Sequence, residues 1–83
     1  TSDGQQRKSI STLESSMERD RQIIQLHQEI LQQKSAQLQQ GVITSSEYIL
    51  QATALRQAGL TLNQHELQLA KIKIDFLTQK GLL

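Results

Sequence analysis

The stretch LQQGVITSSEYIL, residues 38–50, interrupts a chain that otherwise consists largely of helix-forming residues. Gly41 can adopt the left-handed backbone conformation that ends a helix, because it has no side chain to clash. Thr44 can then cap a second helix, with Glu47 at the third helical position completing a capping box. The two positions of a hydrophobic staple also carry apolar residues, Ile43 and Tyr48. The stretch therefore predicts that one helix stops and another starts within a few residues.

Two long helices are predicted on either side of this stretch. The first runs from about residue 10 to 40 and the second from about residue 45 to 80, with Gly81 as its stop. A loop as short as residues 41–44 folds consecutive helices back on each other. We therefore expect an all-α fold, an antiparallel two-helix coiled-coil hairpin that forms a single unit over residues 1–83.

Both predicted helices carry the same heptad repeat. Large apolar residues recur every seven positions, Ile10, Met17, Ile24, Leu31 and Leu38 in the first helix and Tyr48, Leu55, Leu62, Leu69 and Phe76 in the second. If the chain reverses about Ile43, each of these residues faces one from the other helix. The layers between them pair weaker partners, among them His27 with Gly59 and Asp20 with Glu66. Such a hairpin is expected to be thin and, alone, marginally stable.

A second set of apolar residues lies beside this repeat: Ile23, Leu26 and Ile30, then Leu60, Leu67, Ala70, Ile74 and Leu77. A helix with two apolar stripes packs against neighbours on both. Periodicity leaves two arrangements open, a wide core stripe in a three- or four-helix bundle and a curved sheet of helices that closes into a cylinder. The remaining face is polar but mostly uncharged, which suits either solvent or a water-filled lumen. Its expected members are Gln22, Gln25, Gln32, Gln39, Gln51 and Gln64.

One stretch of the second predicted helix also fits the pattern of a β-strand. LQLAKIKIDFL, residues 67–77, alternates apolar and polar residues as a half-buried strand would. We expect a helix here, because the heptad repeat continues through the stretch and the sequence offers no partner strand.

Composition limits the function classes. The chain has 83 residues, a net charge of +1, no cysteine and no long apolar run. These features give no electrostatic footprint for nucleic acid, no disulfide framework and no membrane-spanning helix. Because the chain starts at Thr1 and not at a methionine, we expect it to be a piece of a longer protein.

Residues that could carry chemistry are few. His27 and His65 stand outside any His-Glu-x-x-His pattern, and the predicted register separates them along the hairpin. Ser45 and Ser46 have no partnered histidine nearby. They are therefore better explained as residues that favour the start of a helix than as catalytic nucleophiles. The sequence therefore predicts no catalytic residue, no metal site, no cofactor and no enzymatic activity.

The run LQQGVITSSEYILQATALRQAGLTLNQHELQLAKIKIDFLTQKG, residues 38–81, resembles the outer-membrane efflux proteins of the TolC type. Their repeats show a glycine at a helical tip, a small or apolar pair, a threonine or serine, an acidic residue three positions on, and a further apolar pair. The corresponding residues in this chain are Gly41, Val42-Ile43, Thr44, Glu47 and Tyr48-Ile49. The return helix also resembles theirs in its alanine, leucine and glutamine content and its terminal glycine.

The resemblance implies a segment of the periplasmic α-barrel of a trimeric outer-membrane channel, a passive conduit for export. The docking tip for a membrane-fusion adaptor would then be Gly41, Val42, Ile43 and Thr44. Glu47 matches an acidic position that faces the tunnel entrance in some members, although its role in the capping box is the more common explanation for such a residue. Ile43 and Leu50 replace a basic and an acidic residue of some members, so no gate latched by an ion pair is implied. Contact with the membrane would come only from strands outside this chain.

An alternative function is a coiled-coil interaction module, either an adaptor-type hairpin or an unrelated helical scaffold. In both cases the second apolar stripe stays in water when the hairpin forms. We therefore expect the chain to self-associate, most simply as two hairpins in a four-helix bundle with a twofold axis.

Overall fold

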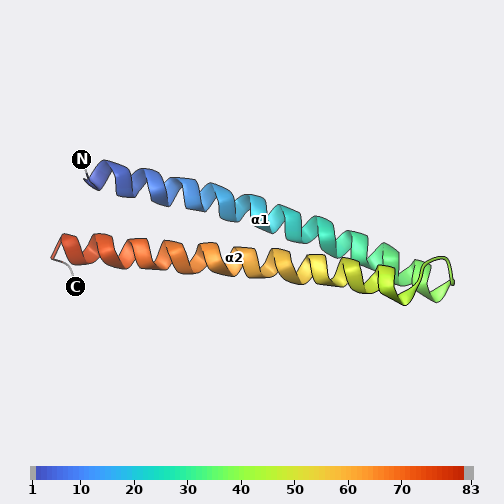
Figure 1. Ribbon diagram of the computed structural model, residues 1–83. Helices are drawn as coiled ribbons and strands as arrows, with labels where there is room; N and C mark the ends of the chain where they lie inside the picture. Colours follow the sequence, from blue (N-terminus) through green and yellow to red (C-terminus); the bar gives the residue numbers. More distant parts are fainter. Residues whose placement is uncertain (1, 82–83) are drawn as a thin grey trace.

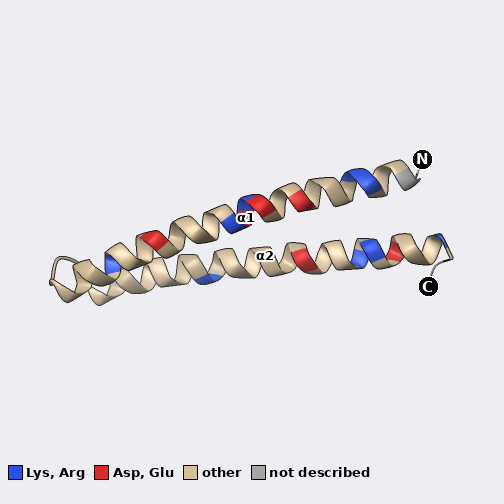
Figure 2. Ribbon diagram, turned by 180° about the vertical axis from the view of Figure 1, so that it is seen from behind, with Lys and Arg blue, Asp and Glu red and all other residues tan. Residues whose placement is uncertain are grey.

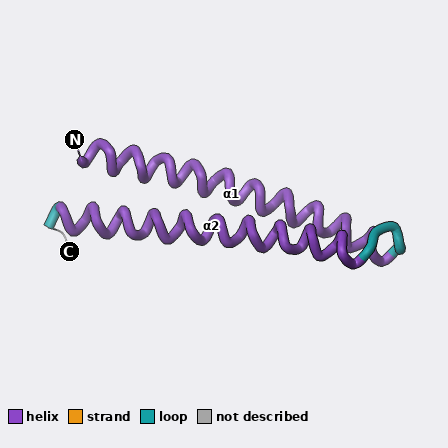
Figure 3. Tube along the Cα trace, viewed as in Figure 1, coloured by secondary structure: helices purple, strands orange, loops and turns teal. Residues whose placement is uncertain are grey.

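The computed structural model describes the backbone of residues 2–81 and the side chains of residues 4–81. Its two helices are α1 (Ser2–Gln39) and α2 (Ser45–Gln79), joined by a short loop. They run antiparallel with both termini at one end (Figure 1). This confirms the predicted all-α hairpin, and helix continues through residues 67–77 (Figure 3).

The hairpin is long and thin. Its extents are 60 × 17 × 14 Å and its radius of gyration is 18.5 Å. A compact chain of this length has a radius of gyration of about 12 Å. Within the described residues each helix packs against only one other helix (Figures 1 and 2). Most side chains therefore keep part of their surface in water.

The first helix starts earlier than the sequence pattern indicated. It begins at Ser2, whereas the heptad repeat predicted a start near residue 10. The segment between is polar but contains good helix formers, Gln5, Gln6, Arg7 and Lys8. Once a helix is nucleated, adding residues to it is easy, so the extension follows from the packed part of α1.

The contact between the helices follows the predicted apolar repeat, and all ten of its residues are at least half-buried. Met17 and Leu69 are the most enclosed of them, at 8% and 9% exposure, and none of the described side chains is completely buried. We call this contact the seam. It is a narrow core, as the heptad pattern predicted.

The intermediate layers of the seam differ from the predicted pairing. On α2 they use His65 and Ile72, whereas Glu66 and Lys73 are exposed. The predicted pairing of Asp20 with Glu66 is therefore wrong. Two carboxylates in a half-buried site repel each other. A slight rotation of α2 relative to the prediction brings His65 into the seam in place of Glu66, and Ile72 in place of Lys73.

Replacing glycine with alanine should have opposite effects on stability at two positions, Gly59 and Gly41. A Cβ at Gly59, inside α2, meets no atom within 4 Å, while Gly41 has a φ of +75°. Gly59→Ala should therefore raise the free energy of unfolding by about 0.5–1 kcal/mol, through helix propensity. Gly41→Ala should lower it by about 1–2 kcal/mol, because a side chain strains the left-handed conformation. Urea denaturation at one fixed protein concentration measures both, and a destabilising Gly59→Ala would contradict the packing described.

Disulfide cross-linking tests the alignment of the helices. Leu31 and Leu55 line the same groove between α1 and α2, whereas Phe76 lies near the other end of the hairpin. In a chain without native cysteines, Leu31→Cys with Leu55→Cys should form an intramolecular disulfide under mild oxidation. Leu31→Cys with Phe76→Cys should not, and its efficient cross-linking would show that the register is wrong. Electrophoresis without reductant distinguishes the two results.

Candidate functional site

The tip of the hairpin is held by backbone hydrogen bonds. The Val42 N–H donates to the Gln37 carbonyl at 2.9 Å, and the Gly41 N–H donates to the Leu38 carbonyl at 3.1 Å. With Gly41 at positive φ, these two bonds form a Schellman motif, which closes the last turn of α1. The predicted role of the glycine as a helix stop is confirmed.

Thr44 begins α2 as an N-cap. Its backbone is extended, with φ −86° and ψ 161°, and its Oγ1 accepts the Glu47 N–H at 3.2 Å. The return bond of a capping box, from the Thr44 N–H to the Glu47 carboxylate, is not formed within residues 4–81. The exposed carboxylate still lies in the first turn of α2, where the helix dipole favours a negative charge.

The tip exposes apolar side chains. Of the four residues predicted to dock a partner, Gly41, Val42 and Thr44 are exposed and Ile43 is half-buried. Two neighbours in α2 were not included in that prediction, although Ile49 is 60% exposed and Leu50 is 71% exposed. The sequence could have indicated their exposure, because both directly follow Tyr48, a seam residue. In a heptad the two residues after a seam position point away from the partner helix. The apolar surface is therefore wider than the loop.

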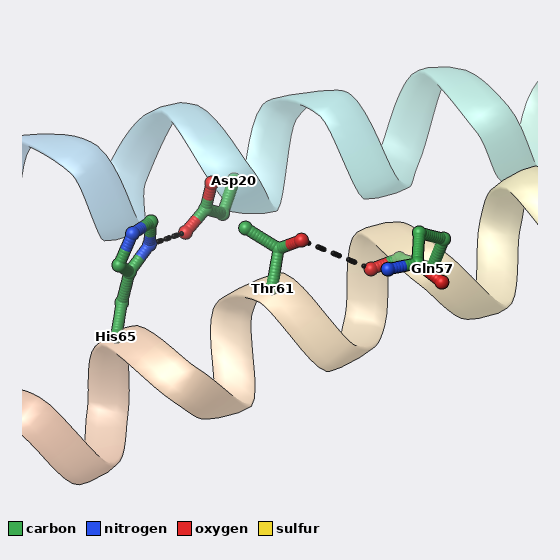
Figure 4. Close-up of polar contacts among 4 residues, drawn as sticks. All are labelled: Asp20, Gln57, Thr61 and His65. Atoms are coloured by element: carbon green, nitrogen blue, oxygen red, sulfur yellow. Dashed lines mark hydrogen bonds and ion pairs between the residues drawn. The ribbon is translucent and has the colours of Figure 1, made fainter.

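Two polar contacts cross the seam. The Asp20 carboxylate is 2.5 Å from Nδ1 of His65, and Asp20 is buried, with 8% of its surface exposed (Figure 4). Nearer the tip, the Gln51 amide donates to Nδ1 of His27 at 3.0 Å. His27 was expected to contact Gly59, but it contacts Gln51 instead, whose longer side chain can form a hydrogen bond. Both histidines serve the contact between the helices.

Most of the second apolar set is exposed outside the seam, although Ile30 and Leu77 are half-buried. Ile23 and Leu26 of α1 are 38% and 54% exposed, and Leu60, Leu67 and Ile74 of α2 are 45%, 72% and 55% exposed. We call these exposed residues the α1 stripe and the α2 stripe. An α-helix turns 100° per residue, so around its own helix axis the α1 stripe lies about 100° from the seam in one direction of rotation. The α2 stripe lies about 150° from the seam in the other direction. Because equal senses of rotation reach the same side of an antiparallel pair, the two stripes do not share a side: the α1 stripe lies on one flank of the hairpin, whereas the α2 stripe faces mainly away from α1.

Other kinds of site find little support in the described part of the chain. No group of three or more metal-ligating side chains comes together among these residues. Neither helix, as described, contains a stretch that is apolar enough to cross a membrane. Two grooves between the helices are open and lined largely by glutamine, serine and leucine side chains. The tip and the two stripes are therefore the candidate functional surfaces.

Comparisons of this chain with protein-family models, with curated proteins and with solved structures give no match. The resemblance described above therefore rests on the residues of the tip and return helix alone.

A double-mutant cycle measures the buried polar contact. Asp20→Ala, His65→Ala and the double variant should give a coupling energy of about 1.5–3 kcal/mol, as expected for a hydrogen bond to a charged group in a partly buried site. The matched control is the exposed pair of Arg21 and Glu18, 3.6 Å apart within α1. Its coupling should stay below about 0.5 kcal/mol. Equal coupling for both pairs in urea denaturation would show that burial does not strengthen the contact.

Proposed function

We propose that this hairpin is a segment of the tunnel wall of a TolC-type outer-membrane efflux channel, a passive conduit in the periplasm. Each helix of such a wall needs neighbours on two sides. The seam supplies one neighbour to each helix, and the exposed stripes can supply the second. The proposal thus concerns packing and passage, with no chemistry carried out by the hairpin itself.

The observation that carries the proposal is that the two exposed stripes do not share one side of the hairpin. A compact four-helix bundle has a single core, which favours stripes on one side. Stripes that face different directions favour a row of hairpins, in which one neighbour contacts Ile23 and Leu26 and another contacts Leu67 and Ile74. A row that curves and closes forms a cylinder, in agreement with a homotrimeric channel.

The polar faces agree with a water-filled lumen. Gln22, Gln25, Gln32 and Gln39 are all exposed on α1. These side chains hydrogen-bond water and carry no charge. A wall lined in this way would pass solutes of either sign without binding them strongly.

The tip supports adaptor docking. It combines a backbone fixed by the Gly41 and Thr44 caps with exposed apolar side chains. Lysines, arginines and acidic residues are more frequent toward the opposite end (Figure 2). A rigid tip with little charge suits an equally apolar helical hairpin of a membrane-fusion adaptor, because neither surface then buries an unpaired charge. Glu47 would stand at the rim, where it stays hydrated.

Bulky residues at the tip test this function in cells that produce the protein. Val42→Trp and Ile49→Trp should each lower efflux-dependent resistance to a panel of dyes and antibiotics several-fold, because both side chains are exposed on the docking surface and neither caps a helix. Chemical cross-linking should still detect the trimer, since the seam and the stripes are intact. Ser11→Trp, at an exposed position near the other end of the hairpin, is the matched control and should leave resistance unchanged.

Full resistance in both tip variants would remove the docking proposal. Loss of the trimer together with resistance would show that the tip acts in assembly. An interaction module unrelated to efflux would show neither a trimer in the outer membrane nor any change in resistance.

A further inference from the structure

The outer face of α2 contains a heptad repeat of its own. Its positions follow one another at intervals of three and four residues, Leu60, Asn63, Leu67, Ala70, Ile74 and Leu77. Five of these six residues are apolar, and Leu67 and Ile74 are more than half exposed. Because this face lies about 150° from the seam, α1 leaves most of it open. Intervals of three and four are the spacing with which one helix packs against another.

The repeat matches itself when a second helix runs in the opposite direction. In antiparallel coiled coils each first position of the heptad faces a fourth position of the other helix. Antiparallel alignment of two copies then gives three kinds of layer, each occurring twice: Leu60 with Leu77, Leu67 with Ala70, and Asn63 with Ile74. Large residues face small ones at the centre, and only the Asn63 layers contain a polar group.

The charges beside this face complement each other in the same alignment. Glu66 and Lys73 are exposed, and neither forms an ion pair within residues 4–81. Antiparallel alignment brings Glu66 of one copy beside Lys73 of the other, and the twofold axis repeats this pair. Such contacts set the orientation of paired helices.

We propose that a second copy of this chain binds antiparallel along the outer face of α2, with the twofold axis beside Gln68 and Leu69. The contact is isologous, so it closes as a dimer of two hairpins and does not extend into a filament. It does not depend on the tunnel function, because it follows from α2 alone. The stripe covers about 26 Å of helix, so the interface is at the small end of specific contacts and the dimer should dissociate on dilution.

Sedimentation equilibrium of the 83-residue chain, from roughly 1 to 100 μM, tests the proposal. The expected result is a monomer–dimer equilibrium. Leu67→Lys should raise the Kd at least tenfold, and circular dichroism should show unchanged helix content because Leu67 makes little contact inside the hairpin. Leu26→Lys, on the α1 stripe, is the matched control and should change the Kd less than twofold. A monomer at all concentrations, or equal weakening by both variants, would overturn the proposal.

A gain of affinity provides a second test that does not depend on disruption. Asn63→Leu replaces the polar group of two layers with an apolar side chain of suitable size. The Kd should fall about tenfold, the equivalent of about 1.4 kcal/mol. An unchanged Kd would show that Asn63 lies outside the contact.

Exchanging the charges tests the direction of the helices. Glu66→Lys and Lys73→Glu should each weaken the dimer several-fold, and the double variant should restore it. In a parallel dimer Glu66 would instead lie near Lys71, so the exchange would leave a repulsive pair and no restoration. Glu29→Lys, an exposed charge change on α1, controls for net charge. Failure of the double variant to recover affinity would contradict the antiparallel contact.

Discussion

The left-handed backbone of Gly41 is the constraint on which the hairpin depends. With φ at +75°, this one residue turns the chain away from α1 and lets the Val42 N–H reach the Gln37 carbonyl. Thr44 then restarts a helix in the reverse direction. A longer loop would let α2 slide along α1, whereas this tight turn fixes where the two heptad repeats meet. The contacts of Met17 with the opposite helix and of Asp20 with His65 follow from that alignment.

How far the sequence predicted the structure depends on the range of the interactions. The tip was predictable because each of its hydrogen bonds joins residues at most five positions apart, so the residue types carry the signal. The apolar layers were predictable because their spacing repeats. The intermediate layers were not, since a small rotation of α2 decides whether His65 or Glu66 faces Asp20, and either rotation keeps the large apolar residues in the seam. The start of α1 was missed because no apolar residue marks a helix in its first eight residues.

The thin seam explains why so much apolar surface stays exposed. A pair of helices covers one stripe on each, and Leu26, Leu67 and Ile74 lie outside it. Covering such side chains contributes about 25 cal/mol per Å² of apolar surface. For a chain with so narrow a core, that contribution is comparable to its whole stability. Association with other helices is therefore coupled to the stability of the hairpin itself.

The tunnel wall and the antiparallel dimer place different demands on the two helices. Both use the outer face of α2, so a helix that covers Leu67 in a larger assembly excludes a second copy there. Only the tunnel wall uses the α1 stripe, because the dimer leaves Ile23 and Leu26 in water. The stripe on α1 is short, and arginine, serine and glutamine occupy its continuation on either side. The stripe on α2 continues for about five turns. In either proposed assembly the longer lateral contact would therefore be made by α2, and the helix that lies against it would determine which of the two assemblies forms.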